Sequence, residues 1–236
     1  MFGRAVGVVR PVLIDKVERD HWQSDAQFLR RRVVVAISLA VGATLLGLSF
    51  STRQGDPAFY PLTFGLAATW AIGSFASGPL HLGHIVSRGT LRRPILAPIA
   101  VGLALAGAFV LGAVVMRTIP PLASLAEDVL GYARAGNLWI IFVITLVNGI
   151  TEELFFRGAL FAAIGLRYPV LISTIIYSLA TIAGGNPLLV FAAAVLGTVV
   201  ALQRRAGGGV LAPILTHITW SLVMLLALPP IFANAP

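Results

Sequence analysis

The sequence predicts an all-α polytopic membrane protein, a bundle of about seven transmembrane helices with its N-terminus in the cytoplasm. Three observations predict this fold class. Of the 236 residues, 58% are hydrophobic and only 11% are charged, whereas soluble domains carry about 25% charged residues. Apolar stretches near 20 residues long recur, which is the length that crosses a hydrocarbon core of about 30 Å. Proline and glycine separate these stretches, and arginines flank them.

The first 32 residues are polar and mixed, and two interpretations stay open for them. They form either an interfacial helix lying on the membrane or a partly ordered cytoplasmic tail. The apolar side of such a helix would hold Val12, Leu13, Val17, Trp22, Phe28 and Leu29.

Seven apolar spans follow this segment. They cover residues 33–50, 58–78, 95–116, 137–157, 169–183, 187–203 and 210–232. The fourth span can continue to Gly165 as a bent helix. Three spans and their loops make up residues 33–136, and a core of four spans makes up residues 137–232.

The arginines indicate the orientation. The N-terminal tail holds seven Arg or Lys residues, and the basic residues after spans two, four and six are Arg88, Arg92, Arg93, Arg167, Arg204 and Arg205. The opposite loops hold only Arg53, Arg117 and Arg134. Because basic loops stay in the cytoplasm, the N-terminus is predicted there and the C-terminus outside.

Composition excludes several function classes. The net charge is +8, and the basic residues flank hydrophobic segments. Basic residues in that position determine the orientation of membrane spans, so nucleic-acid binding is not expected. The chain has no cysteine, which rules out disulfides, thiolate zinc sites and cysteine nucleophiles. Arginine outnumbers lysine sixteen to one, a composition that favours a GC-rich bacterial genome. The sequence also lacks HExxH, GxSxG and Walker A motifs.

The stretch GITEELFFRG, residues 149–158, places three charges in an apolar run. Glu153 and Arg157 stand at i and i+4 on a helix, the spacing of an ion pair. Glu152 projects about 100° away, on the side of Asn148, and has no such built-in cation. A carboxylate of this kind in a low-dielectric cavity is suited to accept a proton from water, as a general base does. The alternative, left open by the residues alone, is that all three charges clamp helices together.

His217 is the second ionisable group at membrane depth, about seven residues into the last span. Its depth matches that of Glu152, so the two are predicted to face one cavity nearer the cytoplasmic side. Ser221, one turn further along, is placed to orient the imidazole.

Two further polar groups have mainly structural interpretations. Tyr177 and Thr181 lie on the fifth span, where hydroxyls usually bond their own backbone or a neighbouring helix. His81 and His84 have i, i+3 spacing that could hold a metal, but histidines at the interface need no ligand.

The segment EELFFRG resembles the EExxxR motif of the CAAX-protease and bacteriocin-processing (CPBP) family, which includes type II CAAX prenyl endopeptidases and bacterial Abi proteins. The stretch RRAGGGVLAPILTHITWSL is similar to the closing segment of that family. The resemblance covers about residues 137–226. It implies peptide-bond hydrolysis at the membrane, with water activated by Glu152. It also implies that Glu153 and Arg157 support and position Glu152, and that His217 belongs to the same site.

The resemblance leaves the use of a metal open. A divalent ion such as Zn²⁺ would be bound by His217 and Glu152; without one, His217 would donate to the oxyanion. Two positions depart from the family pattern, since Thr181 replaces the histidine of Phe-xxx-His and Ser221 replaces the asparagine of His-xxx-Asn. Both keep a hydroxyl but lack the ligand strength of imidazole or the two donors of an amide. These two replacements weaken a metal-dependent mechanism more than a mechanism in which a glutamate activates water.

Taken together, these features predict an intramembrane endopeptidase that acts on a membrane-associated protein or peptide, with its site open to the cytoplasm. Its expected setting is the lipid bilayer of a bacterial cytoplasmic membrane. Leader peptides, bacteriocins or a membrane partner are the expected substrates. A catalytically impaired scaffold or regulator of the same fold is the main alternative, and a small-molecule transporter is the other.

Overall fold

The computed structural model describes residues 10–18, 21–87 and 89–233, and most of them are helical. The helices are α2 (Asp25–Ser51), α3 (Phe59–Ser77), α4 (Leu96–Met116), α5 (Pro120–Ala135), α6 (Leu138–Glu153), α7 (Phe161–Ile164), α8 (Pro169–Ile182), α9 (Pro187–Gly207) and α10 (Leu211–Phe232), with a π-helical segment η1 (Leu154–Leu160) between α6 and α7. Strands β1 (Ile85–Ser87) and β2 (Thr90–Arg92) pair as one small antiparallel hairpin. The predicted all-α bundle is confirmed, with this hairpin as its one addition in the described residues.

Each predicted span contains a helix, and five helices of the described residues are long and apolar enough to cross a membrane. They are α2, α4, the continuous α6–η1–α7 segment, α9 and α10. Helices α3 and α8 are not among them. The 14 residues of α8 extend only about 21 Å at 1.5 Å per residue, less than the thickness of a hydrocarbon core.

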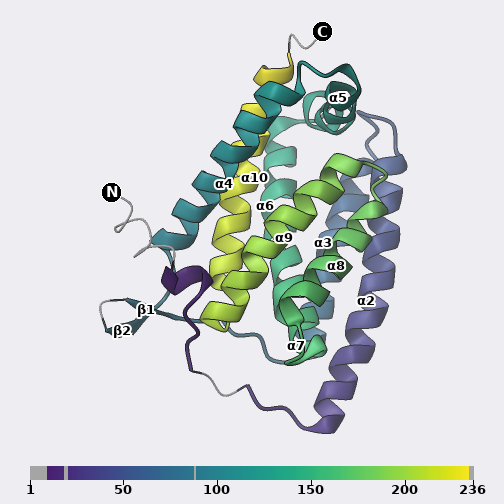
Figure 1. Ribbon diagram of the computed structural model, residues 1–236. Helices are drawn as coiled ribbons and strands as arrows, with labels where there is room; N and C mark the ends of the chain where they lie inside the picture. The colour runs from purple at the N-terminus through teal and green to yellow at the C-terminus, as the bar shows by residue number, and fades with distance from the viewer. Residues whose placement is uncertain (1–9, 19–20, 88, 234–236) are drawn as a thin grey trace.

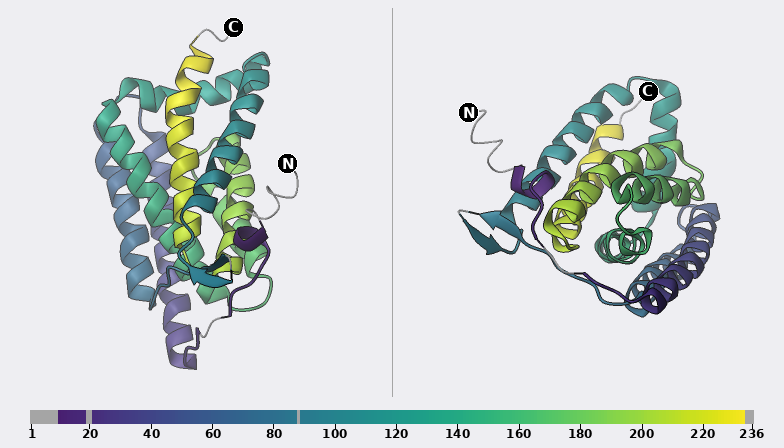
Figure 2. Two further views of the ribbon diagram at one scale, coloured as in Figure 1. Left: turned by 90° about the vertical axis from the view of Figure 1, so that its left-hand side faces the viewer. Right: turned by 60° about the horizontal axis from the view of Figure 1, so that its bottom comes forward.

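The long helices form a bundle in which α6 lies between two helix pairs (Figures 1 and 2). Helices α2 and α3 pack together on one side of α6, and α4 packs with α10 on the other. Helices α8 and α9 form a third pair that covers η1. Helix α5 lies across the upper end of the bundle in Figure 1. This arrangement surrounds the end of α6, where Glu152 and Glu153 lie.

The predicted basic loops meet at one end of the bundle. In Figure 1 the hairpin, the α7–α8 turn and the α9–α10 turn all lie at the lower end, opposite α5. Arg167 lies in the α7–α8 turn, and Arg204 and Arg205 lie near the end of α9, so all three are at this end. Arg88 and residues 1–9 lie outside the described residues. We call this end the basic end and the other the α5 end; the basic end is the one predicted to face the cytoplasm.

The described part of the N-terminal segment leads into the first helix of the bundle. The first helix of the bundle begins at Asp25 rather than near residue 33, because Ser24 and Gln27 form a capping box there. Phe28 and Leu29 therefore belong to a spanning helix. Upstream, the Val17 amide donates to the Ala206 carbonyl, and Val12 is buried. This part of the segment packs against the bundle; residues 19 and 20 lie outside the described residues.

The fourth span continues as one helical segment almost to Gly165, the end that the sequence allows for it. It begins at Asn137, whose side chain accepts from the amides of Trp139 and Ile140, and runs to Ile164. Gly165, with a φ of 85°, ends it. The π-helical segment η1 begins directly after Glu153, and such segments often occur at functional sites.

Glycines bring the start of α10 against the loop that follows α3. The His84 amide donates to Gly207, and the amides of Val210 and Leu211 donate to His81 and Leu82. A Cβ on Gly209 would collide with the backbone of Leu82 and Gly83, so only glycine permits this approach. The glycine-rich turn thus fixes the start of the helix that carries His217.

Candidate active site

Glu153, Arg157 and His217 form a buried cluster between α6, η1 and α10. Glu153 Oε1 lies 3.0 Å from Arg157 Nη1 and 2.7 Å from His217 Nδ1. The Glu153 and Arg157 side chains are fully buried. The predicted ion pair is therefore present, and a buried pair of this kind needs further hydrogen bonds to be tolerated. Arg157 Nη2 provides one by donating to the Gly197 carbonyl over 3.2 Å.

Glu152 has a different environment from its neighbour. Its Oε2 accepts a hydrogen bond of 2.7 Å from the Tyr177 hydroxyl, and within the described residues it takes part in no salt bridge. The Arg157 guanidinium instead lies 4.5 Å from the centroid of the Tyr177 ring. The cation of the site is thus held by Glu153 and by an aromatic face, which leaves Glu152 with a neutral partner.

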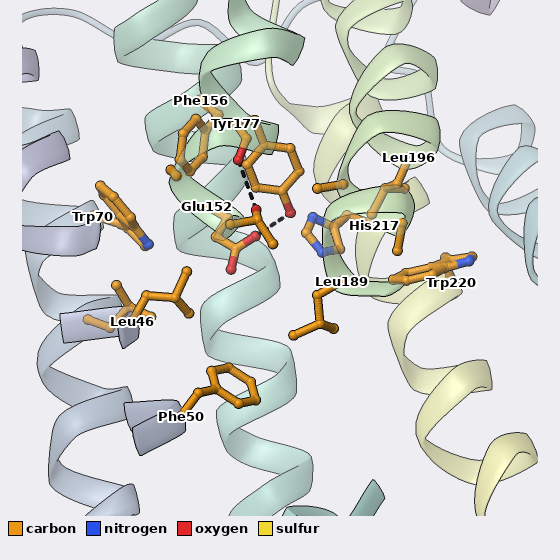
Figure 3. Close-up of a pocket in the computed structure, with 15 residues that line it drawn as sticks. Leu46, Phe50, Trp70, Glu152, Phe156, Tyr177, Leu189, Leu196, His217 and Trp220 are labelled. Atoms are coloured by element: carbon orange, nitrogen blue, oxygen red, sulfur yellow. Dashed lines mark hydrogen bonds between the residues drawn. The ribbon is translucent and has the colours of Figure 1, made fainter. Parts of the chain in front are cut away.

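Glu152, Tyr177 and His217 line one cavity of about 210 Å³ (Figure 3). These three residues come from α6, α8 and α10, and further lining comes from α2, α3, η1 and α9. The shared cavity of Glu152 and His217 follows the prediction made from their depths. Apart from Thr181 and Trp220, the remaining lining is apolar: Leu46, Phe50, Leu66, Trp70, Phe156, Ala180, Leu189, Ala192, Ala193 and Leu196.

His217 is held by Glu153 rather than by Ser221. The structure gives no hydrogen bond between Ser221 and His217 among the described residues, and the 2.7 Å contact to Glu153 occupies Nδ1. Because Nδ1 is engaged with Glu153, Nε2 is the ring nitrogen available for a hydrogen bond or a proton transfer in the cavity. Gly149 of α6 faces the imidazole, and a Cβ at that position would make ordinary contact with His217 Cδ2 at 3.7 Å.

Thr181 and Asn148 have backbone partners. Thr181 lines the cavity, yet its hydroxyl donates to the Tyr177 carbonyl one turn back, the usual behaviour of hydroxyls in membrane helices. Asn148 donates to the Ile144 and Thr63 carbonyls over 3.0 and 3.4 Å and is absent from the cavity lining. Its contact is therefore with α3, which it joins to α6.

Trp70 and Gly197 are site residues that the sequence reasoning missed. The Trp70 ring packs on Phe155 with centroids 4.4 Å apart and forms a wall of the cavity. Gly197 provides the carbonyl that Arg157 binds, and its missing side chain gives the guanidinium room. Both lie in helices whose residues read only as apolar, so no local pattern marks them.

The donor set of the site falls short of a zinc site. Glu153 is fully buried and does not line the cavity, so the metal-binding side chains that face the cavity are Glu152 and His217. Catalytic zinc normally has three protein ligands, and no cluster of three His, Cys, Asp or Glu side chains suited to a metal occurs in the part of the chain described. The alternative metal pair at His81 and His84 has another explanation too, because His81 stacks on His21 at 3.8 Å.

A comparison with protein families matches the part of the chain that builds the site. Residues 134–223 match the family model of the type II CAAX prenyl endopeptidase Rce1-like proteins. No curated protein and no solved structure matches the chain. The matched segment contains Glu152, Glu153, Arg157, Tyr177 and His217, so the family resemblance is confirmed for the segment that builds the site.

Proposed function

Because its site lies within a segment of the Rce1-like family, we propose that this chain is an intramembrane endopeptidase with Glu152 as its general base. One observation carries the proposal: Glu152 faces an apolar cavity without a cation of its own, while Glu153 beside it is fully buried and contacts both Arg157 and His217 through Oε1. The two carboxylates thus have separate roles, one chemical and one structural.

The proposed reaction needs only the residues of this chain and a water molecule. Glu152 accepts a proton from water as the water oxygen attacks the carbonyl carbon of the peptide bond. The carbonyl π electrons move to its oxygen, which becomes the oxyanion. When the tetrahedral intermediate collapses, the C–N bond breaks and Glu152 passes its proton to the leaving nitrogen. A carboxylate in an apolar cavity is well suited to both transfers.

The neighbours of Glu152 have supporting roles in this mechanism. The Tyr177 hydroxyl orients the carboxylate, and His217 Nε2 is the proposed donor to the oxyanion. Glu153 holds the imidazole through Nδ1, as orienting carboxylates do in other hydrolases. No step here passes through a metal, in keeping with the two metal-binding side chains, Glu152 and His217, that line the cavity.

Glu152→Gln is the test, because it keeps the size of the side chain and removes the base. The purified protein is reconstituted in liposomes and screened against quenched fluorescent peptides and candidate membrane proteins. We expect cleavage to fall at least about 100-fold, the lower range for loss of a general base. The exposed Glu18→Gln is the matched control and should keep full activity. Intact cleavage by Glu152→Gln would refute the proposal.

A membrane scaffold or regulator of the same fold is the second candidate, and Thr181 is the observation that favours it. The Thr181 hydroxyl, which stands where the family pattern has histidine, donates to the backbone carbonyl of Tyr177 in its own helix. It therefore does not donate to Glu152 or to a bound substrate. The scaffold predicts that no substrate is cleaved and that Glu152→Gln leaves association with a partner unchanged. A transporter has less support, because a transport path would have to pass residues that are fully packed below the cavity, such as Phe155 and Arg157.

A further inference from the structure

The cavity around Glu152 extends toward one end of the bundle. Phe50 lies one residue from the end of α2, and Leu189 lies in the first turn of α9; both line the cavity. Their surroundings identify the end. Tyr132 of α5 donates to the Phe50 carbonyl, and Asn186, the N-cap of α9, donates to the Leu125 carbonyl of α5. The cavity therefore runs from Glu152 toward the α5 end.

A packed layer lies between Glu152 and the basic end. Phe155, Phe156 and Arg157, which follow Glu152 along the chain, are at most 1% exposed. Arg204 closes the next layer by donating to the Arg157 carbonyl over 2.6 Å. Below it, the backbone bonds between residues 81–84 and 207–211 join the loop to the α10 start. The sequence predicts a site open to the cytoplasm. A substrate that entered from that side would have to cross this packed layer to reach Glu152.

Several partly exposed side chains of the cavity lining also lie toward the α5 end. Glu152, Thr181, Leu189 and Ala192 are all partly exposed to solvent. Thr181 lies one residue from the end of α8, and Ala192 lies in the second turn of α9. Except for Glu152 itself, these residues belong to helix ends on the α5 side. A molecule reaching Glu152 therefore passes them first.

The lining also limits what can enter. Glu152 is its one acidic residue, and it contains no Lys or Arg, so an acidic side chain of a substrate would lose its water without gaining an Arg or Lys partner. A basic side chain would pair with Glu152 and so occupy the proposed base. The volume of about 210 Å³ is below the range of about 300–1,000 Å³ for pockets that enclose drug-sized ligands. It suits a few small or apolar side chains of an extended peptide better than a lipid.

We propose that the site takes its substrate from the α5 end, opposite the arginine-rich loops, and that the substrate is a short uncharged apolar stretch of a polypeptide present on that side. The substrate class rests on the proposed endopeptidase function; the direction of access does not. With the basic end in the cytoplasm, cleavage occurs on polypeptides that have reached the other side of the membrane.

The absence of cysteine makes this direction measurable without background. Thr181→Cys and Ala192→Cys each place one thiol in the cavity lining. Ser124→Cys, exposed on α5, reports the α5 side, and Leu91→Cys, 62% exposed on the hairpin, reports the basic side. Each variant is labelled with a membrane-impermeant maleimide in sealed vesicles of both orientations.

We expect the cavity thiols to be labelled in the same vesicles as Ser124→Cys, at least about tenfold faster than in the opposite orientation. Two cavity positions are used so that a poorly folded variant does not decide the result. Labelling from the side of Leu91→Cys, or from neither side, would overturn the direction of access. The two reporters define the sides, so the result does not depend on the predicted topology.

A second arm tests the substrate class. Quenched fluorescent peptides with a central Leu-Ala-Leu, or with Asp at the central position, are supplied to the labelled side of proteoliposomes. We expect cleavage of the apolar peptide and at least tenfold less of the acidic one; equal cleavage would overturn the substrate class. If the thiols label from the α5 side and no peptide is cut, the endopeptidase function fails while the direction of access stands.

Discussion

The Tyr177 hydroxyl donates to Glu152 Oε2 over 2.7 Å, while the ring of the same tyrosine carries the Arg157 guanidinium 4.5 Å from its centroid. One side chain of α8 therefore contacts both the free carboxylate and the cation of the paired one. The ring packs against the guanidinium, and the hydroxyl fixes the direction of the carboxylate.

Tyr177→Phe should lower peptide cleavage by about 10- to 100-fold. The change keeps the ring under Arg157 and removes one hydrogen bond to a charged group, which contributes about 1.5–3 kcal/mol. We expect the loss in kcat rather than in KM, because the hydroxyl orients the base and does not line the binding surface alone. Kinetics of the reconstituted enzyme measure it. Tyr168→Phe, on a side chain that is 69% exposed, is the control; an unchanged kcat in Tyr177→Phe would contradict an orienting role.

Glu153→Gln should destabilise the fold more than it changes the chemistry. It leaves the Arg157 charge buried without its partner, and breaking a buried pair costs about 3–5 kcal/mol. We expect a lower Tm in detergent and lower expression. The double variant Glu153→Gln/Arg157→Met removes both charges and should lose less stability than the sum of the two single variants. Additive losses would show that the ion pair has no clamp role.

Much of the fold was predictable because each membrane span is a continuous run of apolar residues in the sequence. Helix α10 was placed at residues 210–232 and is observed at Leu211–Phe232, and the spacing of Glu153 and Arg157 predicted their ion pair. Such features depend on local sequence and on the hydrocarbon thickness alone.

The rest depends on contacts between distant segments. Helix α5 has too few apolar residues to span and was read as a loop; its buried Ala123, Ala126 and Leu130 pack on the bundle end. The Tyr177–Glu152 bond joins residues 25 positions apart, a pairing that no local period predicts. The direction of the cavity likewise depends on how α2, α8 and α9 end relative to one another.

Gly42→Ala should destabilise the α2–α3 contact. A Cβ at Gly42 would collide with the Trp70 ring, and overpacking of this kind costs about 1–3 kcal/mol. Because Trp70 also lines the cavity, we expect cleavage to fall together with Tm. The matched control is Gly107→Ala on exposed α4, where a Cβ meets nothing within 4 Å; it should leave Tm unchanged or raise it slightly. Equal effects of the two substitutions would contradict the close packing.

Acidification should loosen the basic end through His81, which lies outside the spanning helices. Its imidazole stacks on His21 at 3.8 Å. Burial, and then the charges of Arg204 and Arg31, lower the pKa of His81 below its ordinary value of 6.5. The unfolded chain thus binds the proton more readily than the folded one. The stability from neutral His81 is present above about pH 6.5 and is lost as the pH falls from there toward the lowered pKa.

Because the His81 carbonyl holds the Val210 amide at the α10 start, protonation should also loosen that junction. We therefore expect wild-type protein at pH 5 to have a lower Tm, and faster proteolysis of the segment before Asp25, than at pH 7.5. His81→Phe keeps a ring for stacking and cannot titrate, so its Tm should depend less on pH over that range. Parallel Tm curves for the two proteins would show that the pH response lies elsewhere. A smaller slope in His81→Phe, with the same Tm at pH 7.5, would assign the response to this imidazole and its neighbouring arginines.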